Sequence, residues 1–453
     1  MEKCTAVLLA AGEGTRMKST KPKVLHEAAG IPMIGWPLAA LREAGADKII
    51  VVTGPGMQAL RDAAGEGVLF AEQTERRGTG HAAMQAAPFL TGGGCAVILP
   101  GDMPLITADT VKKVIDTAEA GGYACVLLTA SYDNPTGYGR IIRDAQGNVL
   151  RIVEEANATA EEKKIREANA FVYCVRVPLL LECLKKLSPK PPKNEYYLTD
   201  IVEILNEAGE KVGAVVTDAE ECLGVNDRVQ LAQASALLRR RIAGKHMENG
   251  VTLIDPQNTY IDAKSKIGQD TVIYPGVILE DSRIGEGAVL YQGSRISKSV
   301  IGAGCTVQNS VVLESEVGAG TTVGPYAYLR PGTQVGEGCR IGDFVEVKNS
   351  RIGAGTKVPH LSYVGDADLG EKINIGCGTV FVNYDGKRKF RSVVKSGAFI
   401  GCNTNLISPV EIGEGAYIAA GSTITKDVPP HSLAIARSRQ IVRTDWKDKR
   451  DEE

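Results

Sequence analysis

The chain has 453 residues, with 52 Lys and Arg against 54 Asp and Glu, and a formal net charge of −2 at pH 7. No apolar run is long enough to span a bilayer, so the sequence predicts a soluble protein of two or three domains, with no membrane partner. The balanced charge gives no basic surface for a nucleic-acid backbone, so no nucleic-acid partner is expected. The ten Cys lack paired spacing, which predicts reduced thiols. Residues 4–11 are expected to form a buried strand and not a secretory leader, which predicts a cytoplasmic protein.

Residues 1–227 alternate short apolar runs with helical patterns such as 34–46 and 108–122. Strands of four to seven apolar residues between longer helices predict a mostly parallel sheet covered on both faces, a Rossmann-like α/β domain. The expected strands lie within residues 6–12, 48–54, 67–70, 95–102 and 124–130.

Residues 228–250 are predicted to form a connecting helix. Asn226 or Asp227 can cap its start, and Gly244 is a plausible C-cap. Arg239, Arg240 and Arg241 are expected on its solvated face. An apolar stripe is expected from Val229, Leu231, Leu237, Leu238 and Ile242.

From Val251 onward, an aliphatic residue repeatedly precedes Gly, at steps of 16 to 18 residues from Ile267 to Val335 and of 6 from Val335 to Ile341 and from Leu369 to Ile375. The unit is therefore a hexapeptide with three units per turn, which predicts a triangular parallel coil over residues 251–453. About 18 residues per coil and about 4.8 Å between strands predict a height on the order of 50 Å. The segment from Ile375 to Ile400 interrupts the repeat and is expected to form a projecting loop. The repeating aliphatic residues are Ile267, Ile284, Ile301, Val317, Val335, Ile341, Ile352, Leu369, Ile375, Ile400 and Ile412.

A phosphate cradle is predicted directly after the first strand. Gly12 and Gly14 allow backbone N–H groups to approach a phosphate, and Arg16 adds a forked cation. The spacing differs from that of a P-loop, and a lone G-x-G is weak evidence for a dinucleotide site. Asp102, after the fourth expected strand, is a candidate Mg²⁺ ligand, although a turn or helix-cap role is equally open from the GDMP sequence alone.

The order of the further motifs resembles that of the sugar-nucleotide pyrophosphorylases. LAAGEGTRM is followed in order by KPKVL, by Gln73 with GTGHA shortly after it, and then by LPGDMP, TGYGRI, IVEE, EANA and GVND. The resemblance implies that Mg²⁺ is held by Asp102 and Asn226 and that Arg16 and Lys23 grip phosphates. It assigns Gly139, Glu154 and Asn169 to the sugar, and the nucleotide to Leu9, Ala10, Ala11, Gly12, Gln73, Gly78 and Thr79. RRGTG stands here for the usual QLGTG, and NAF for NTG.

A second group of polar residues lies in the repeat region and includes Arg330, Lys348 and Lys389, which offer cations for a phosphate. The alternative is that the repeat serves only for assembly and catalyses nothing. A coil built only on stacked aliphatic side chains does not require such polar groups, which argues against that alternative. His360, in HLSYVGDA, is the candidate general base, which contributes typically about 10² to 10⁴ in rate when an amine attacks a thioester. A zinc site of the trimeric carbonic anhydrase kind is not expected, because only His360 and His431 lie in the repeat.

Taken together, the two halves resemble the family of bifunctional N-acetylglucosamine-1-phosphate uridyltransferase/glucosamine-1-phosphate acetyltransferases. The resemblance implies a left-handed β-helix, a homotrimer with acetyl sites between subunits, and UDP-N-acetylglucosamine as product. Its substrates would be acetyl-CoA, glucosamine-1-phosphate, N-acetylglucosamine-1-phosphate and UTP. It assigns the amino-sugar phosphate to Arg330, Lys348, Tyr363, Asn374 and Lys389. It assigns acetyl-CoA to Cys377, Asn383, Tyr384, Cys402, Ala420 and Arg437.

Cys377 stands where Ala is common, and Cys402 where Ser is common, so weaker CoA contacts are expected because a thiol is a weak donor. Two other functions stay open. The repeat could serve only assembly or regulation beside a nucleotidyltransferase, as in glucose-1-phosphate adenylyltransferases, or the whole chain could be a structural trimer.

Overall fold

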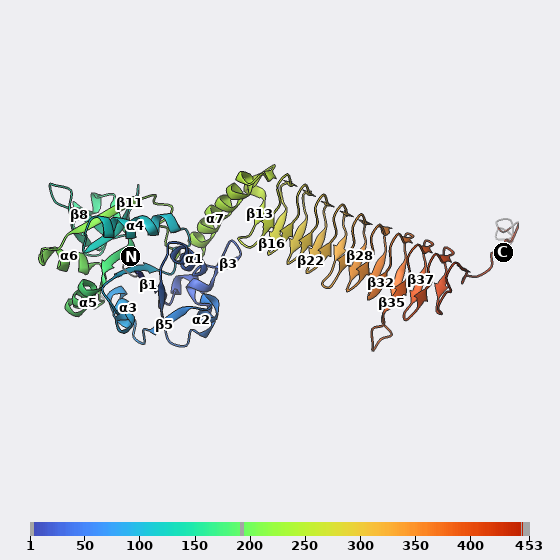
Figure 1. Ribbon diagram of the computed structural model, residues 1–453, viewed down its shortest axis with the longest axis horizontal. Helices are drawn as coiled ribbons and strands as arrows, with labels where there is room; N and C mark the ends of the chain where they lie inside the picture. Colours follow the sequence, from blue (N-terminus) through green and yellow to red (C-terminus); the bar gives the residue numbers. More distant parts are fainter. Residues whose placement is uncertain (1–3, 191–193, 445, 447–453) are drawn as a thin grey trace. The chain divides into compact units, whose positions relative to one another are not determined.

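The computed structural model describes residues 4–190, 194–444 and 446, and the chain divides into two compact units, Met1–Leu238 and Arg239–Glu453 (Figure 1). Helix α7 (Arg228–Glu248) contributes to both units. The predicted domain limits, 1–227, 228–250 and 251–453, stay a prediction. No helix in the described ranges has the combined length and apolarity of a membrane span.

The first unit is built on one mixed, mostly parallel sheet with the strand order β11-β7-β10-β6-β1-β4-β5. All five predicted strands are present. The sequence analysis missed β10, which is antiparallel to β6 and β7, the β8–β9 hairpin beside it, and β11, which is parallel to β7. The strands are β1 (Cys4–Leu9), β2 (Glu27–Ala28), β3 (Ile31–Pro32), β4 (Lys48–Thr53), β5 (Val68–Glu72), β6 (Cys95–Pro100), β7 (Cys125–Ser131), β8 (Arg140–Arg143), β9 (Val149–Val153), β10 (Glu167–Arg176) and β11 (Val212–Thr217).

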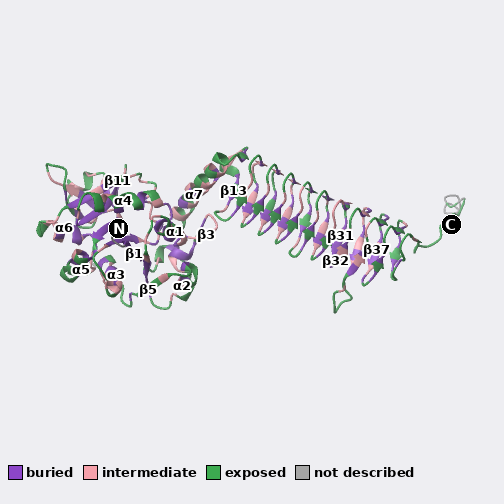
Figure 2. Cartoon of the chain, viewed as in Figure 1, coloured by how far each residue is buried: buried purple, intermediate pink, exposed green. Residues whose placement is uncertain are grey.

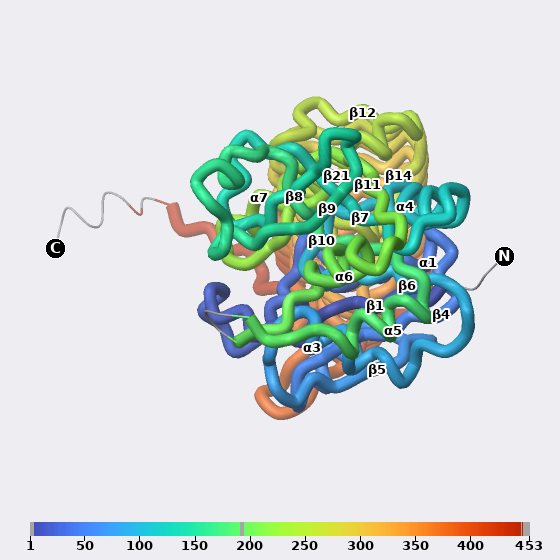
Figure 3. The backbone as a smooth tube through the Cα atoms, turned by 90° about the vertical axis from the view of Figure 1, so that its left-hand side faces the viewer, coloured from blue at the N-terminus to red at the C-terminus, as the bar shows by residue number. Residues whose placement is uncertain are grey.

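Helices cover both faces of this sheet, as the continuous burial of β1 requires. Leu8 packs in the same core as α1, α2 and α4, whereas Val7 packs with α3, α5 and α6. Figures 1 and 3 show α3 and α5 on the opposite side of the sheet from α4. The helices are α1 (Gly35–Glu43), α2 (Gln58–Ala64), α3 (Thr79–Ala86), α4 (Ala108–Ala120), α5 (Val177–Lys186) and α6 (Asp200–Glu207), with short 3₁₀ turns η1 (Thr15–Met17), η2 (Lys23–Leu25), η3 (Ala87–Phe89), η4 (Glu162–Lys164) and, in the second unit, η5 (Pro256–Asn258).

The register between β1 and β6 places two predicted motifs together. Leu9 pairs with Pro100 in parallel strands, so the glycine loop after β1 and Asp102 after β6 leave the same edge of the sheet. The backbone N–H of Gly101 donates to the Leu9 carbonyl at 2.8 Å, which holds the two loops side by side.

Helix α7 begins as predicted, because Asp227 is the N-cap and its Oδ1 accepts from the Gln230 N–H at 2.8 Å. It differs from the prediction at Gly244 and Val229. Gly244 lies inside the helix and does not end it, since α7 continues to Glu248. Val229 is 67% exposed, so the predicted stripe does not include it, while Leu238 is buried. Arg239 stacks over the Tyr260 ring at 5.1 Å, whereas Arg240 and Arg241 are exposed.

The second unit is a solenoid of short parallel strands in three sheets, as the hexapeptide period predicts. One sheet pairs Ile267 with Ile284, Ile284 with Ile301, and onward through Val317, Val335, Ile352 and Leu369. Figure 2 shows buried residues recurring in every coil and exposed residues at the turns. The aliphatic side chains therefore stack inward, coil upon coil.

The strands of the first solenoid sheet are β12 (Thr252–Leu253), β15 (Val272–Ile273), β18 (Val289–Leu290), β21 (Thr306–Val307), β24 (Thr322–Val323), β27 (Arg340–Asp343), β30 (Lys357–His360), β33 (Asn374–Ile375), β36 (Phe399–Ile400), β39 (Tyr417–Ile418) and β41 (Leu433–Ala434). Those of the second are β13 (Tyr260–Ile261), β16 (Ile278–Glu280), β19 (Arg295–Ser297), β22 (Val311–Leu313), β25 (Tyr328–Leu329), β28 (Glu346–Lys348), β31 (Tyr363–Gly365), β34 (Val380–Val382), β37 (Asn405–Ile407) and β40 (Thr423–Ile424). Those of the third are β14 (Lys266–Ile267), β17 (Arg283–Ile284), β20 (Val300–Ile301), β23 (Glu316–Val317), β26 (Gln334–Val335), β29 (Arg351–Ile352), β32 (Ala367–Leu369), β35 (Ser392–Val394) and β38 (Glu411–Ile412).

The predicted loop projects from the solenoid between β34 and β35 and is drawn in orange beside the β35 label in Figure 1. A bridge between Tyr384 and Lys389 closes it. Its first residue, Asn383, is buried, so the loop begins inside the polar cluster described below.

Candidate functional sites

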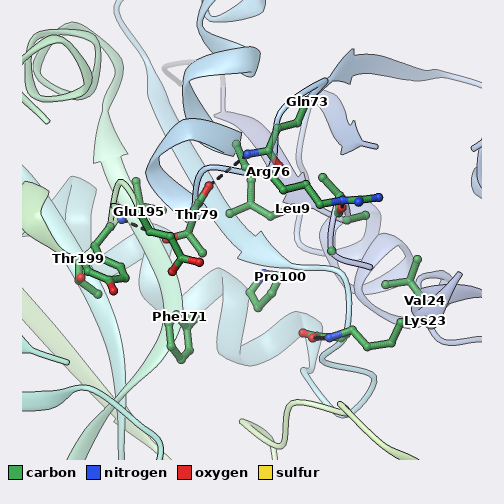
Figure 4. A pocket seen from close by; sticks show the side chains of 18 of the residues that line it. Leu9, Lys23, Val24, Gln73, Arg76, Thr79, Pro100, Phe171, Glu195 and Thr199 are labelled. Carbon is green, nitrogen blue, oxygen red and sulfur yellow. Dashed lines mark hydrogen bonds and ion pairs between the residues drawn. The ribbon is translucent and has the colours of Figure 1, made fainter. Parts of the chain in front are cut away.

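A cavity of about 530 Å³ opens at the edge of the sheet where β1 and β6 end. Figure 4 shows Lys23 and Val24 at one end of it and Thr79, Glu195 and Thr199 at the other. Most residues predicted for the nucleotide, the phosphates and the sugar lie in its wall: Leu9, Ala10, Ala11, Gly12, Arg16, Lys23, Gln73, Gly78, Thr79, Asp102 and Glu154.

Lys23 joins the two predicted metal ligands. Its ammonium forms an ion pair with the Asp102 carboxylate and donates to Asn226 Oδ1 at 3.0 Å. Asn226 lies 203 residues farther along the chain, yet both oxygens face one cationic group. A carboxylate and an amide oxygen that converge on a cation suit Mg²⁺, which keeps several waters and takes few protein ligands. The residues present therefore fit a divalent cation.

The glycine loop is shaped for Lys23 as well as for phosphate. Gly14 has φ +66°, and a Cβ there would lie 2.5 Å from the Lys23 Cβ, so a side chain at residue 14 would displace Lys23. Arg16 follows in η1 and is exposed at the cavity wall. Two cations therefore flank the backbone that the sequence predicts for phosphate.

Gln73 is held in place at the far side of the cavity from Lys23. It is buried, and its Nε2 donates to the Gly78 carbonyl at 3.2 Å. Thr79 begins α3, and its hydroxyl accepts from the Leu198 N–H at 3.1 Å. These contacts fix the GTG turn against the segment 195–199.

Glu154, Gly139 and Asn169 form one group. Burial raises the pKa of the Glu154 carboxyl, and the Thr199 hydroxyl donates to it at 3.0 Å. The Gly139 carbonyl accepts from the Asn169 N–H at 2.9 Å, and a Cβ on Gly139 would lie 2.8 Å from Ile152. The Asn169 side chain is buried and donates to the Tyr173 hydroxyl at 2.6 Å. Gly139 and Asn169 thus lie behind Glu154 and do not line the cavity wall.

Several cavity residues escaped the sequence analysis. Arg76 donates from Nε to the Ala11 carbonyl at 3.0 Å and pairs with Glu13 across the glycine loop. The departure from the usual QLGTG motif was the signal that could have identified Arg76. Phe171 ends NAF, the second departure from the usual motifs, and could have been identified in the same way. The remaining residues lie outside the quoted motifs and gave no comparable signal: Tyr173, Glu195, Tyr197 and Thr199.

In the second unit, His360 ends β30 and is paired with Asp343 of the preceding coil. Its Nδ1 lies 2.7 Å from Asp343 Oδ1, and this hydrogen bond lowers the pKa of the Asp343 carboxyl. Because a carboxylate only accepts, Nδ1 carries the proton and Nε2 of the neutral ring is left as the basic nitrogen. His360 is 47% exposed. No three His, Cys, Asp or Glu side chains of the described residues gather as a metal site would need.

A polar cluster lies beside His360 in the coils of β28, β31 and β34. Asp366 is buried and accepts from Asn383 at 2.6 Å, from Asn349 at 2.6 Å and from Lys348 at 3.5 Å. The Asn383 amide also donates to the Tyr363 hydroxyl at 3.4 Å. The adjacent Lys348 ammonium lowers the pKa of Lys389.

Arg330 and Asn374 stand apart from these contacts. Arg330 pairs with Glu346 at 2.8 Å, one coil away. Asn374 lies in β33, in the same sheet as the His360 strand, and within the described residues no hydrogen bond joins it to Lys348 or Tyr363. The structure therefore brings together Lys348, Tyr363 and Lys389, but leaves Asn374 on the sheet that carries His360.

Four of the six residues predicted for acetyl-CoA, namely Cys377, Cys402, Ala420 and Arg437, follow one corner of successive coils, while Asn383 and Tyr384 lie in the projecting loop. The Cys377 carbonyl accepts from the Asn403 N–H, and the Cys402 carbonyl from the Gly421 N–H. A Cβ on Gly421 would lie 3.8 Å from Arg437, and Ala420 directly precedes it. Cys402, Tyr384, Ala420 and Arg437 are exposed, and Cys377 is partly exposed. The other eight Cys are buried, and all ten are free thiols.

Comparison with known proteins covers both units. Residues 6–169 match the MobA-like NTP transferase domain, and residues 314–349 and 391–426 match the bacterial transferase hexapeptide repeats, in agreement with the predicted left-handed β-helix. The chain is 52% identical to the bifunctional protein GlmU of Clostridium acetobutylicum, over 99% of each chain. It is 51% identical to that of Caldanaerobacter subterraneus subsp. tengcongensis, over 99% of each chain. It is 50% identical to that of Acetivibrio thermocellus, over 98% of this chain and 97% of the relative.

Proposed function

Because the chain belongs to the family of bifunctional GlmU proteins, we propose that it makes UDP-N-acetylglucosamine in two steps. The second unit acetylates glucosamine-1-phosphate with acetyl-CoA. The first unit then transfers UMP from UTP to N-acetylglucosamine-1-phosphate and releases pyrophosphate. The observation that carries this proposal is that each unit holds its own cationic cluster beside one further reactive group: the Asp102–Asn226 oxygen pair in the first, and the His360 imidazole in the second.

In the uridyl transfer, a phosphate oxygen of the sugar phosphate attacks the α-phosphorus of UTP, and the bond to pyrophosphate breaks. The reaction mainly requires charge neutralisation. Arg16 and Lys23 bind phosphate oxygens, while Gln73, Gly78 and Thr79 hold the nucleotide with Leu9, Ala10, Ala11 and Gly12. Asp102 and Asn226 would hold Mg²⁺, which supplies further positive charge when bound.

The sugar of N-acetylglucosamine-1-phosphate is placed against Glu154. Since Glu154 lines the cavity and is supported by Thr199, it can accept from a sugar hydroxyl. Gly139 and Asn169 do not line the cavity; they contact each other, and Gly139 packs closely against Ile152 of β9, the strand that precedes Glu154.

In the acetyl transfer, the amine nitrogen of glucosamine-1-phosphate attacks the thioester carbonyl carbon. The nitrogen–carbon bond forms, the carbon–sulfur bond breaks, and the CoA sulfur leaves. Nε2 of His360 takes the amine proton, because Asp343 holds the other ring nitrogen in its protonated form. Arg330, Lys348, Tyr363, Asn374 and Lys389 bind the amino-sugar phosphate. Asn383 and Tyr384 bind acetyl-CoA, together with the corner formed by Cys377, Cys402, Ala420 and Arg437.

Assembly and location complete the proposal. A homotrimer would place the exposed His360 of one copy and the projecting loop of another at one site, and the protein would act in the cytoplasm. Both statements remain predictions.

The experiment omits acetyl-CoA, UTP, glucosamine-1-phosphate and Mg²⁺ one at a time from the purified chain. His360→Ala should abolish acetyl transfer and leave uridyl transfer from N-acetylglucosamine-1-phosphate intact, whereas Asp102→Ala should do the reverse. Equal loss of both activities in either variant would reject two independent sites. Uridyl transfer without any acetyl transfer by the unaltered chain would favour a solenoid that serves assembly alone.

A further inference from the structure

Asp366 is the most heavily engaged carboxylate of the solenoid cluster. It lies at the turn between β31 and β32 with φ +50°, and its side chain is 10% exposed. Two amide groups and one ammonium converge on it, from Asn349, Asn383 and Lys348. Burial alone would raise the pKa of Asp366, but these donors keep it below its usual value. The carboxylate is therefore ionised in the folded chain.

An ionised carboxylate accepts hydrogen bonds and donates none, so only the NH₂ of Asn383 can face it. This fixes which way the amide of Asn383 is turned. The same NH₂ also reaches the Tyr363 hydroxyl, and Asn383 Oδ1 accepts no hydrogen bond from any residue that the structure describes. The buried carboxylate thus leaves Asn383 with one uncommitted oxygen, which can accept from an N–H of a ligand.

Gly365 is adapted to this contact. A Cβ on Gly365 would lie 2.7 Å from Asn383 Nδ2 and 2.4 Å from the Tyr363 hydroxyl. A side chain there would push the amide away from Asp366. The contact between Asn383 and Asp366 therefore requires glycine at residue 365 as well as the carboxylate at residue 366.

Asp366 also holds a cation. Its Oδ2 lies 3.5 Å from Lys348, whose ammonium adjoins Lys389. The negative charge of Asp366 keeps Lys348 in place before a phosphate arrives. The same carboxylate therefore contacts one residue proposed for the sugar phosphate and one proposed for acetyl-CoA.

We propose that Asp366 is a positioning residue for acetyl transfer, which turns the Asn383 oxygen toward an N–H group of bound substrate and holds Lys348 for the phosphate. The N–H belongs either to the amine of the amino sugar or to an amide of the acetyl-CoA arm. The inference rests on the proposed acetyl transfer. If the unaltered chain shows no acetyl transfer, the proposed function fails; if it does and Asp366 proves dispensable, only this inference fails.

The test compares Asp366→Asn with Asp368→Asn in the full-length chain. Asp368 is a matched control, because it lies in the same coil but its carboxylate pairs with Arg391 at 2.5 Å and not with Lys348 or Asn383. Asp366→Asn should lower kcat/KM for acetyl transfer by about 10- to 100-fold, the range for a buried polar group that loses its partner. Asp368→Asn should change it less than about threefold, since exposed pairs contribute little. Uridyl transfer should be unchanged in both.

The split between kinetic constants separates positioning from general structural damage. In Asp366→Asn, KM for glucosamine-1-phosphate should rise through Lys348, and KM for acetyl-CoA should rise if the Asn383 oxygen serves acetyl-CoA. If only the sugar KM rises, that oxygen serves the sugar amine. The acidic limb of the pH–kcat profile should stay where it is, because His360 keeps its contact with Asp343.

A second variant covers the case in which Asp366→Asn does not fold. Gly365→Ala keeps the charge of Asp366 but displaces the Asn383 amide, and it should raise the KM for the same substrate through Asn383 alone. Acetyl transfer within about twofold of the unaltered chain in either folded variant would overturn the inference.

Discussion

Lys23 occupies the place between the two proposed metal ligands, so its removal should tighten divalent-metal binding by the substrate-free chain. Its ammonium contacts both Asp102 and Asn226 Oδ1, and the side chains of Lys23 and Asp102 are 12% and 17% exposed. A metal ion that reaches these oxygens must displace the ammonium. Lys23→Met keeps the length of the side chain and removes the competing charge.

The size of the effect follows from the ion pair. Two unit charges 4 Å apart interact by about 4 kcal/mol at an effective dielectric constant of 20. Rehydration of the released ammonium returns much of this, so we expect a net effect of about 1 to 2 kcal/mol, or about 5- to 30-fold in metal affinity. Uridyl transfer should nevertheless fall, because Lys23 is also proposed to bind phosphate.

Titration with Mn²⁺, followed by electron paramagnetic resonance without nucleotide, measures this affinity directly. Lys21→Met is the matched control, since Lys21 is exposed in the same segment. Equal or weaker Mn²⁺ binding by Lys23→Met would show that Lys23 and the metal do not compete for Asp102 and Asn226.

Three further predictions concern single residues. Glu154→Gln should raise the melting temperature at pH 7 to 8 but not at pH 3. Burial raises the pKa of Glu154, so the folded chain loses stability as the pH rises through that pKa. Below the pKa of Glu154 in the unfolded chain, this carboxyl is neutral in the folded and the unfolded state, so the substitution then removes no charge. Gly244→Ala should raise the free energy of unfolding by about 0.5 to 1 kcal/mol, measured in urea for the transition in which α7 unfolds. A Cβ at residue 244 meets no atom within 4 Å, and glycine is unfavourable inside a helix. Alkylation should modify exposed Cys402 ahead of the buried thiols and slow acetyl transfer; retained transfer with Cys402 modified, or equal slowing of Cys402→Ser, would contradict this.

Periodicity made most of the fold predictable. In the solenoid, the spacing of aliphatic residues sets which side chains stack, and the pairing of Ile284 with Ile301 and of Val335 with Ile352 follows directly. In the first unit, each buried parallel strand is a continuous apolar run. Strand β10 was missed because it is a long antiparallel insertion whose partners are decided by tertiary contacts.

The candidate sites were predictable as motifs but not as contacts. Lys23 and Asn226 are 203 residues apart, and nothing in either local sequence indicates that they meet. Asp366 lies within the quoted HLSYVGDA motif and Asp343 lies outside it. The roles of both depend on the register between coils, which places Asp343 beside His360 and Asp366 beside Lys348. Gly244 was misplaced because a glycine inside a helix and a glycine after one look alike locally.

Both sites pair a lysine with a carboxylate before any substrate is present. Lys23 contacts Asp102, and Lys348 contacts Asp366, in each case with little exposure. Each carboxylate fixes its lysine in position, but the arriving phosphate must then compete for the ammonium. Each site therefore binds phosphate more weakly than a free lysine would, but its cation is already in position. When phosphate takes the lysine, the carboxylate loses its partner. The site therefore favours a substrate that also brings a new partner for that carboxylate.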